Sequence, residues 1–313
     1  MKKTIRLGTR SSPLALIQAE EVKRRLLEAW PHLCAEAEIE IVPIRTTGDW
    51  KPEHKDLRFI EMGGNKGLFT KEIEEALLSD HIDIAVHSMK DVSTLLPQGV
   101  MIGAIIERAD PREAFIGRTV PTLDDLPSGS VVGTASLRRQ AQILAQRPDL
   151  RITPLRGNIE TRLKKLEEGM ADATILAVAG LARLGLQSRI SSFMSVEAML
   201  PASSQGALGA EIRIGDDDIC ALLAPLNDAA SYVCIAAERA VMRVIDGNCH
   251  TPAGAYARIT DAGLLELEAL VARADGTDLL RLSAVGKGEE AEALGEELGK
   301  NLKSRSPADI FTA

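Results

Sequence analysis

The chain has 313 residues, of which 45% are hydrophobic and 3% aromatic, and its formal net charge is −8. This length and apolar content suffice for two or three packed domains, whereas the acidic balance and the few aromatic residues argue against nucleic-acid binding. No apolar run is long enough to cross a bilayer, and residues 5–9 alternate like a strand rather than a signal peptide. We therefore expect a cytoplasmic protein without a nucleic-acid or membrane partner.

The first third of the chain alternates between strand and helix patterns. Ser12 followed by Pro13 is typical of a helix start, and residues 46–58 lack periodicity and predict a mobile loop. In chain order, the predicted strands are 5–9, 39–44 and 82–86, and the predicted helices are 14–29 and 68–78.

The middle third repeats the opening pattern. A short strand at 131–132, the turn GTAS at 133–136 and a helix over 137–146 correspond to GTRS at 8–11 and the helix that follows it. A second correspondence pairs DIAVH at 83–87 with DATIL at 172–176. Both matches predict two lobes of one plan, and two facing α/β lobes make a cleft of helix N-termini that suits anions.

The last third predicts a separate α+β unit. An amphipathic helix covers 228–245 and ends at Gly247, and a final helix covers 289–304. Between them, three strands joined by short turns predict an antiparallel sheet: 255–260, 264–271 and 279–284.

The most informative motif is HSMKDV at residues 87–92, which follows the apolar run 82–86. It delivers Lys90 and Asp91 to the C-terminal end of a buried strand, where ligands bind in open α/β sheets. Alone, such a pair is more often a surface ion pair, so its meaning depends on the other motifs.

Arginines are dense in the middle third. Arg138 and Arg139 fall in the first turn of a predicted helix, where cations oppose the helix dipole. A solvated helix face would explain a single arginine, but an Arg-Arg pair beside a Gly-Thr-x-Ser turn favours a carboxylate-binding site.

The four cysteines lack C-x-x-C spacing, so the sequence predicts neither a zinc site nor a redox pair. Cys34, Cys220 and Cys234 are predicted to be small buried hydrophobic residues. Cys249 differs from these three, because it lies in a polar turn beside His250, and two such ligands without partners are a weak case for zinc.

The HSMKDV motif and four further segments together resemble the porphobilinogen deaminase (hydroxymethylbilane synthase) family, from about residue 5 to the C-terminus. These segments are TRSSPLAL at 9–16, GGNKGLF at 63–69, GTASLRRQ at 133–140 and DGNC at 246–249. The resemblance implies an α/β fold with two lobes like those of type II periplasmic binding proteins and a small α+β C-terminal domain. Lobe 1 would comprise 1–106 and 207–225, with a lid loop at about 46–65, lobe 2 would comprise 107–206, and the cofactor-attachment domain 226–313.

The same resemblance implies a transferase of porphyrin and haem biosynthesis. It would condense four porphobilinogen molecules head to tail, with loss of ammonia, into hydroxymethylbilane on a dipyrromethane cofactor. Cys249 would hold that cofactor through a thioether, and Asp91 would be the catalytic carboxylate that stabilises the methylene-pyrrole cation. A monomer is implied, with uroporphyrinogen-III synthase as a candidate for hand-off of the product.

Further positions match those that hold acetate and propionate groups, or lie near them, in the family: Arg10, Ser12, Gln18, Lys66, Phe69, Lys90, Thr134, Ser136, Arg138, Arg139, Arg156, Arg162 and Arg183. The chain departs from the family pattern at Ser93, Asn65 and Ser204. Ser204 replaces a glycine in the second interlobe crossing, where it either stiffens the hinge or requires a left-handed backbone.

Two alternatives come from other functional classes. A non-catalytic two-lobed binding protein for small dicarboxylates or anions is compatible with the lobes, but the third domain with Cys249 and the lack of an export signal speak against it. A ligand-sensing regulator would need a helix-turn-helix, and the first strand at residue 5 leaves no room before it.

Overall fold

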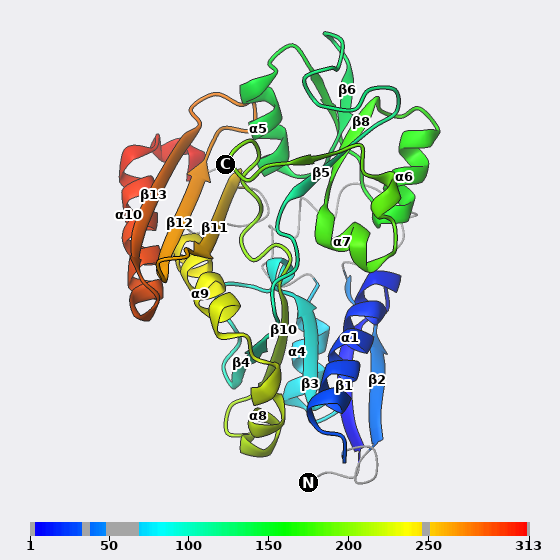
Figure 1. Cartoon of the computed structure of the whole chain (residues 1–313), viewed down its shortest axis with the longest axis vertical. Coiled ribbons are helices and arrows are strands. Elements are labelled where there is room, and N and C mark those ends of the chain that lie inside the picture. The colour runs from blue at the N-terminus through cyan, green and yellow to red at the C-terminus, as the bar shows by residue number, and fades with distance from the viewer. Residues whose placement is uncertain (1–3, 33–37, 48–68, 246–250, 312–313) are drawn as a thin grey trace. The chain divides into compact units, whose positions relative to one another are not determined.

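The computed structural model describes residues 4–32, 38–47, 69–245 and 251–311. The chain divides into two compact units, Met1–Arg108 with Ala207–Tyr232, and Ala109–Gly206 with Val233–Ala313. Unit 1 contains one five-stranded sheet, and unit 2 contains a second five-stranded sheet and a three-stranded sheet (Figure 1).

The sheet of unit 1 has the strand order β2-β1-β3-β10-β4. β1 runs parallel to β2 and β3, whereas β10 runs antiparallel to β3 and β4. The strands are β1 (Thr4–Arg10), β2 (Glu38–Ile44), β3 (Ile84–Ser88), β4 (Val100–Ile105) and β10 (Leu208–Arg213). The helices and 3-10 turns are α1 (Pro13–Ala29), α4 (Lys71–Leu78), η2 (Met89–Asp91), α8 (Asp217–Leu223) and η4 (Ala224–Leu226).

Alternation along β3 separates two apolar layers. Ile84 and Val86 belong to the core that includes residues of α1, whereas Ala85 packs with Ile73 and Leu77 of α4. Successive side chains of a strand point to opposite faces of the sheet. The two helices therefore cover opposite faces, and any residue with the parity of Ala85 lies on the α4 side.

The predicted start of the first helix is confirmed: α1 begins at Pro13, and the Oγ of Ser12 accepts a hydrogen bond from the Ala15 N–H at 3.4 Å. The predicted helix 68–78 begins only at Lys71, after Thr70. The predicted strand 82–86 lies at 84–88 instead. Asp83 precedes it, because its N–H donates to the Arg6 carbonyl and its carboxylate accepts from the Arg6 N–H, before the paired residues begin.

The five-stranded sheet of unit 2 has the order β7-β6-β8-β5-β9. β6 runs parallel to β7 and β8, and β5 runs antiparallel to β8 and β9. This is the plan of unit 1, so the predicted repetition is confirmed. The strands are β5 (Glu113–Gly117), β6 (Val131–Gly133), β7 (Arg151–Thr153), β8 (Ala173–Ala177) and β9 (Ser192–Met194). The helices and 3-10 turn are α5 (Leu137–Gln146), α6 (Ile159–Glu167), α7 (Val178–Arg183) and η3 (Gln187–Arg189).

The third sheet, β11-β12-β13, is antiparallel as predicted. Its apolar face packs with residues of α9 and α10 in one core. The elements are α9 (Ala229–Val244), β11 (Ala253–Ile259), β12 (Leu264–Val271), β13 (Leu280–Lys287), η5 (Gly288–Glu290), α10 (Ala291–Arg305) and η6 (Ala308–Phe311). The expected fold class is therefore confirmed, while the expected boundaries of three separate domains stay a prediction.

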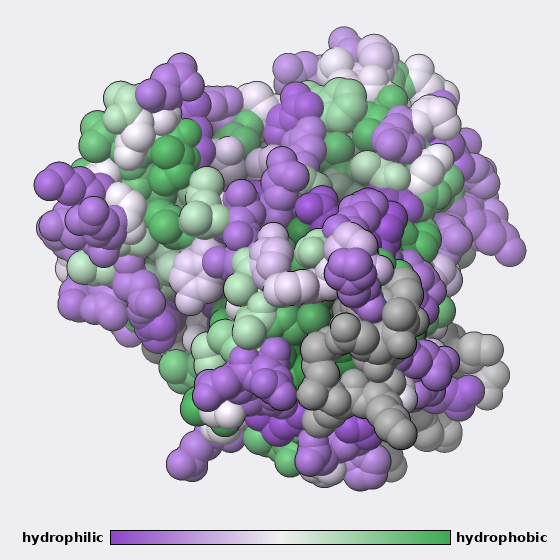
Figure 2. All heavy atoms as spheres, turned by 60° about the horizontal axis from the view of Figure 1, so that its bottom comes forward, coloured by the Kyte–Doolittle hydropathy of each residue, from purple (hydrophilic) through white to green (hydrophobic). Residues whose placement is uncertain are grey.

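Hydrophilic side chains make up most of the face shown in Figure 2, as the acidic composition leads one to expect. Within the described ranges, no single helix is long and apolar enough to cross a membrane. The segments Asp217–Leu226 and Ala229–Val244 reach that length and composition only together, with a bend of 107° between them.

Candidate active site

The HSMKDV motif lies where β3 ends. Met89 is 1% exposed and its N–H donates to the Ala207 carbonyl at 3.0 Å, so it anchors the turn η2 against the chain that enters β10. Lys90 is exposed and Asp91 is half-buried on this turn. The buried strand thus presents both side chains at its C-terminal end, as the sequence predicts.

Asp91 lies on a pocket formed entirely within unit 1. Other predicted site residues on its wall are Arg10, Ser12, Gln18 and Phe69. The remaining wall residues are Thr9, Leu14, Ala15, Thr70, Val86, His87 and Ser88. Residues distant in sequence are therefore gathered at the ends of the parallel strands β1 and β3 and at the start of α1.

The contacts within this pocket fix its polar groups. The Arg10 guanidinium lies 4.3 Å from the centroid of the Phe69 ring, within the range of a cation–π interaction. The Gln18 Nε2 donates to the Ser88 Oγ at 2.8 Å. One pocket thus combines a guanidinium, suited to a carboxylate, with the Asp91 carboxylate, suited to an N–H donor or a cation.

His87 also lines this pocket, although it was not among the predicted site residues. It is 4% exposed, and its Nε2 lies 3.2 Å from the Oε2 of Glu211, which is fully buried. The available signal was the parity of β3, which places His87 on the α4 side with Ala85. Its partner was not visible, because Glu211 follows more than one hundred residues later.

In unit 2, the predicted residues Thr134 and Ser136 form the turn between β6 and α5. The Ser136 Oγ accepts from the Arg139 N–H at 3.4 Å and caps α5, and the Thr134 Oγ1 accepts from the Ser136 N–H at 3.1 Å. This turn follows the end of a parallel strand, as Ser11 and Ser12 do in unit 1.

Arg138 and Arg139 are buried rather than solvated, so a solvated helix face is the wrong explanation for them. Both donate to the carboxylate of Glu113, with contacts of 2.5 Å from Arg138 Nη2 and 2.8 Å from Arg139 Nη2. The Arg138 Nη1 also donates to the Leu200 carbonyl. Burial raises the pKa of Glu113, but the charges of Arg139 and Arg138 outweigh burial and hold that pKa at about 2.

The other predicted arginines of unit 2 are more accessible. Arg156 is exposed in the segment after β7. The Arg162 Nε donates to the Gly157 carbonyl at 2.7 Å, and the Arg183 Nη2 donates to the Gly206 carbonyl at 3.2 Å. Arg156 and Arg162 thus lie on one loop–helix segment, and Arg183 is held at the end of α7.

Two predicted site residues, Lys66 and Cys249, lie outside the described residues, as do Cys34 and most of the expected lid loop. Of the cysteines that the structure describes, Cys234 is buried as predicted, whereas Cys220 is only half-buried. Among the described side chains, no group of three His, Cys, Asp or Glu is arranged to hold a metal ion.

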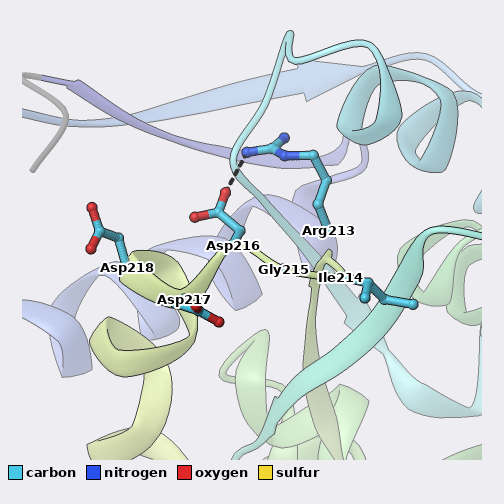
Figure 3. A pocket seen from close by; sticks show the side chains of 6 residues that line it. All are labelled: Arg213, Ile214, Gly215, Asp216, Asp217 and Asp218. Atoms are coloured by element: carbon cyan, nitrogen blue, oxygen red, sulfur yellow. Dashed lines mark hydrogen bonds and ion pairs between the residues drawn. The ribbon is translucent and has the colours of Figure 1, made fainter.

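A second hollow in unit 1 is lined by residues 213–218 (Figure 3). Asp216 points toward Arg213, with an Oδ2–Nη2 distance of 2.7 Å, and its Oδ1 accepts from the Ile219 N–H as the cap of α8. Asp217 and Asp218 occupy the first turn of that helix, where carboxylates interact favourably with the helix dipole. Helix capping therefore accounts for this acidic cluster.

Comparison with known protein families supplies an independent test. Residues 5–221 match the model described as "Porphobilinogen deaminase, dipyromethane cofactor binding domain", and residues 232–304 match "Porphobilinogen deaminase, C-terminal domain". The cofactor of this chain is therefore dipyrromethane.

Similar curated proteins and solved structures were also found. A porphobilinogen deaminase of Chromobacterium violaceum is 48% identical over 98% of this chain and 96% of its own length, and one of Syntrophobacter fumaroxidans is 47% identical over 96% and 94%. Among solved structures, a putative methionine-binding lipoprotein of Bacillus subtilis is 14% identical over 72% of this chain and 90% of its own length. The TM-score between the two structures is 0.44. The sequence matches show that the chain belongs to the porphobilinogen deaminase (hydroxymethylbilane synthase) family.

Proposed function

We propose that this chain, a transferase of tetrapyrrole biosynthesis, condenses four porphobilinogen molecules head to tail, with loss of ammonia, into hydroxymethylbilane. The dipyrromethane cofactor would act as the primer, attached through a thioether to Cys249. The observation that carries the proposal is the pocket of unit 1, which both Arg10 and Asp91 line. Porphobilinogen has both carboxylates and a pyrrole N–H, and this pocket has a partner for each.

The residues of this pocket also fit dipyrromethane. That group carries acetate and propionate carboxylates and two pyrrole N–H donors, which suit Arg10 and Asp91 respectively. When bound, it supplies the free α-carbon to which the first substrate is joined. Gln18 and Ser88, linked by their 2.8 Å hydrogen bond, give the pocket a fixed polar edge.

Asp91 is the proposed catalytic carboxylate. Porphobilinogen must lose its amino group to form a methylene-pyrrole cation, and a carboxylate beside the pyrrole N–H stabilises the positive charge as it develops. The same carboxylate orients the ring and can take part in moving protons. Because the turn η2 is anchored by the buried Met89, this charge is held at a fixed place.

The arginines of unit 2 are proposed to bind the carboxylates of the growing chain. Arg156 is exposed in the segment between β7 and α6, and Arg162, on α6 itself, is half-buried with its Nε bonded to the Gly157 carbonyl. Arg138 and Arg139 are assigned to the same role, with Glu113 fixing their guanidinium planes. Further proposed contacts are Ser12, Lys66, Phe69, Lys90, Thr134, Ser136 and Arg183.

We also propose a cytoplasmic monomer that passes its product to uroporphyrinogen-III synthase. Hydroxymethylbilane is a reactive product, so transfer to a second enzyme is a useful arrangement. Sedimentation of the purified protein, alone and mixed with that synthase, measures both the oligomeric state and the association.

The test of the cofactor attachment is the intact mass of the purified protein. The unmodified sequence mass plus two porphobilinogen units less two ammonia molecules is expected for the wild type, and the sequence mass alone for Cys249→Ser. Cys220→Ser, which removes a half-buried thiol, is the matched control and should keep the added mass. A wild-type chain that stays unmodified after incubation with porphobilinogen would contradict the proposal.

A further inference from the structure

The turn η2 carries Lys90 and Asp91, and a buried residue lies on each side of this charged pair. Met89, which precedes the pair, is 1% exposed, and Val92, which follows it, is 6% exposed. The Val92 N–H donates to the Met89 carbonyl at 3.2 Å and closes the turn. The place of the Asp91 carboxylate therefore depends on where Met89 is fixed.

Met89 is fixed against β10 in two ways. Its N–H donates to the Ala207 carbonyl at 3.0 Å, just before this strand begins. Its side chain lies against Gly209, because a Cβ placed on that glycine would be 2.1 Å from the Met89 Sδ and 2.9 Å from its Cγ. Atoms at these distances overlap, so Met89 keeps this position because residue 209 has no side chain.

The surroundings of Gly209 leave no room for an added methyl group. β10 lies between β3 and β4 (Figure 1), and Gly209 is opposite His87 and Ile105. A Cβ at this position would also be 3.3 Å from the Cδ1 of Ile105, which is 1% exposed. The φ of Gly209 is not positive, so space rather than backbone conformation requires the glycine. In such a closed core, a larger residue displaces its neighbours and shifts the backbone.

We propose that Gly209 is a positioning residue for the condensation reaction, and that it acts through Met89 on Asp91. This inference rests on the catalytic role proposed for Asp91. The pocket takes its polar groups from separate elements: Arg10 and Gln18 belong to β1 and α1, whereas Asp91 belongs to η2. A displaced Met89 would thus move the catalytic carboxylate and leave the guanidinium that binds a substrate carboxylate in place. A misplacement of about 1 Å can lower a rate by about 100-fold.

The first test is Gly209→Ala in the cofactor-loaded protein. Its kcat should fall by about 10- to 100-fold, whereas its KM for porphobilinogen should change by less than about threefold, because Arg10 stays in place and the long side chain of Lys90 can adjust. The matched control is Gly103→Ala, which adds the same methyl group beside β10, where it would meet the Ile212 side chain at 3.0 Å. This control should keep the kcat of the wild type. A wild-type kcat in Gly209→Ala would overturn the inference.

The second test distinguishes the contact with Met89 from a general loss of packing. Met89→Ala removes the Sδ and Cγ that the new methyl group would overlap, and it should itself lower kcat, since η2 loses its apolar anchor. Adding Gly209→Ala to Met89→Ala should then change kcat by less than about twofold, because the two substitutions act through one contact. A further fall in kcat in the double variant would overturn the inference, and this outcome is measurable even where Gly209→Ala alone does not fold.

A third readout does not depend on turnover. In ¹³C-methyl spectra of the methionines, the signal that is missing from Met89→Ala should move in Gly209→Ala and stay in place in Gly103→Ala. A signal that does not move in Gly209→Ala would overturn the inference while leaving the proposed function intact. Wild-type turnover in Asp91→Asn would instead remove the catalytic role on which the inference rests, and failure of the wild type to form hydroxymethylbilane would remove the proposed function itself.

Discussion

The two five-stranded sheets have one strand order but differ where the third parallel strand ends. In unit 1, β3 is followed by Lys90 and Asp91, whereas in unit 2 the corresponding positions after β8 are Ala179 and Gly180. One copy of the plan therefore presents charges at this end of the sheet, and the other continues as the helix α7. The comparison indicates that one strand plan occurs twice, while the Lys-Asp pair at this end of the sheet is present in one copy.

One hydrogen-bond arrangement at the start of the third parallel strand repeats in both lobes. The Asp83 Oδ2 accepts from the Arg6 N–H at 2.9 Å, and the Asp172 Oδ2 accepts from the Val131 N–H at 2.8 Å. In both lobes the aspartate N–H also donates to the carbonyl of that same partner residue. Each aspartate thus holds the start of the third strand in register with the first.

The buried glutamates Glu113 and Glu211 of the two lobes differ in their hydrogen-bond partners. In unit 2, the Glu113 carboxylate is bonded by Arg138 and Arg139, both on α5. In unit 1, Glu211 has His87 nearby but lacks hydrogen bonds of good geometry in the described part of the chain. Two arginine partners hold the Glu113 carboxylate in one geometry, whereas the hydrogen-bond geometry around Glu211 is not fixed in this way.

The largest effect is expected for Asp91→Asn, which removes the negative charge that follows β3 and that has no counterpart after β8. Turnover should fall by about 1,000-fold, because an amide keeps a hydrogen bond but loses the charge that stabilises the cation. The rate of porphobilinogen consumption measures this change, with Asp261→Asn in the exposed turn after β11 as the control. Wild-type turnover in Asp91→Asn would remove this carboxylate from its proposed role.

Glu113→Gln should destabilise unit 2 by about 3 kcal/mol, because it leaves two buried guanidinium groups without a counter-charge. The free energy of unfolding, from urea titration followed by circular dichroism, measures this loss. Glu211→Gln changes a buried side chain whose oxygens have no hydrogen-bond partner of good geometry among the described residues, so its cost should be clearly smaller. Equal losses in the two variants would contradict the contrast drawn between the lobes.

Acid should weaken the same ion cluster. The pKa of Glu113 is about 2 in the folded protein against 4.5 for an ordinary glutamate, so its contribution is fully present above pH 4.5 and is lost as the pH falls toward 2. About 2 kcal/mol should be lost by pH 3. The free energies of unfolding of the wild type and of Glu113→Gln should therefore converge as the pH falls. A constant difference between them would show that the pKa of Glu113 is the same in the folded and the unfolded chain.

The two helix caps that follow the first parallel strands should contribute similar amounts. Ser12→Ala and Ser136→Ala each remove a hydroxyl that accepts an N–H at 3.4 Å. A loss of about 1 kcal/mol is expected in each case. The thermal midpoints of the two variants, compared with Ser128→Ala in the loop before β6, test whether the caps of the two lobes are equivalent.

Local features of the fold were predictable, and distant partners were not. Ser12 and Ser136 were predictable as the starts of two helices, because a cap depends on neighbouring residues. The insertion of β10 between β3 and β4 had no local signal, since its partners precede it by more than one hundred residues. The pairing of Glu113 with Arg138 likewise depends on strand order, so the sequence identified an arginine pair but not the carboxylate that fixes it.

Ser204 replaces a glycine of the family, and the sequence left two expectations for it: a stiffer hinge or a left-handed backbone. Its φ is +64°, so the left-handed backbone is the one that the structure shows. The Ser204 N–H donates to the Glu238 Oε2 at 2.6 Å, and the other oxygen of Glu238 accepts from the Ala257 N–H at 2.8 Å. The buried Glu238 therefore fixes the strained residue against β11.

Ser204→Gly should stabilise the protein slightly. A left-handed conformation costs a non-glycine residue about 1–2 kcal/mol, and the extra freedom of glycine in the unfolded chain offsets about 0.4–1 kcal/mol of that gain. A net gain of about 0.5–1 kcal/mol in the free energy of unfolding is expected, since the N–H bonded to Glu238 is kept. Ser203→Gly, which changes the adjacent residue without a positive φ, should instead destabilise. A loss of stability in both variants would mean that the serine hydroxyl compensates the backbone strain. Ser204→Ala keeps the strain and removes the hydroxyl, so its free energy of unfolding measures the contribution of that hydroxyl directly.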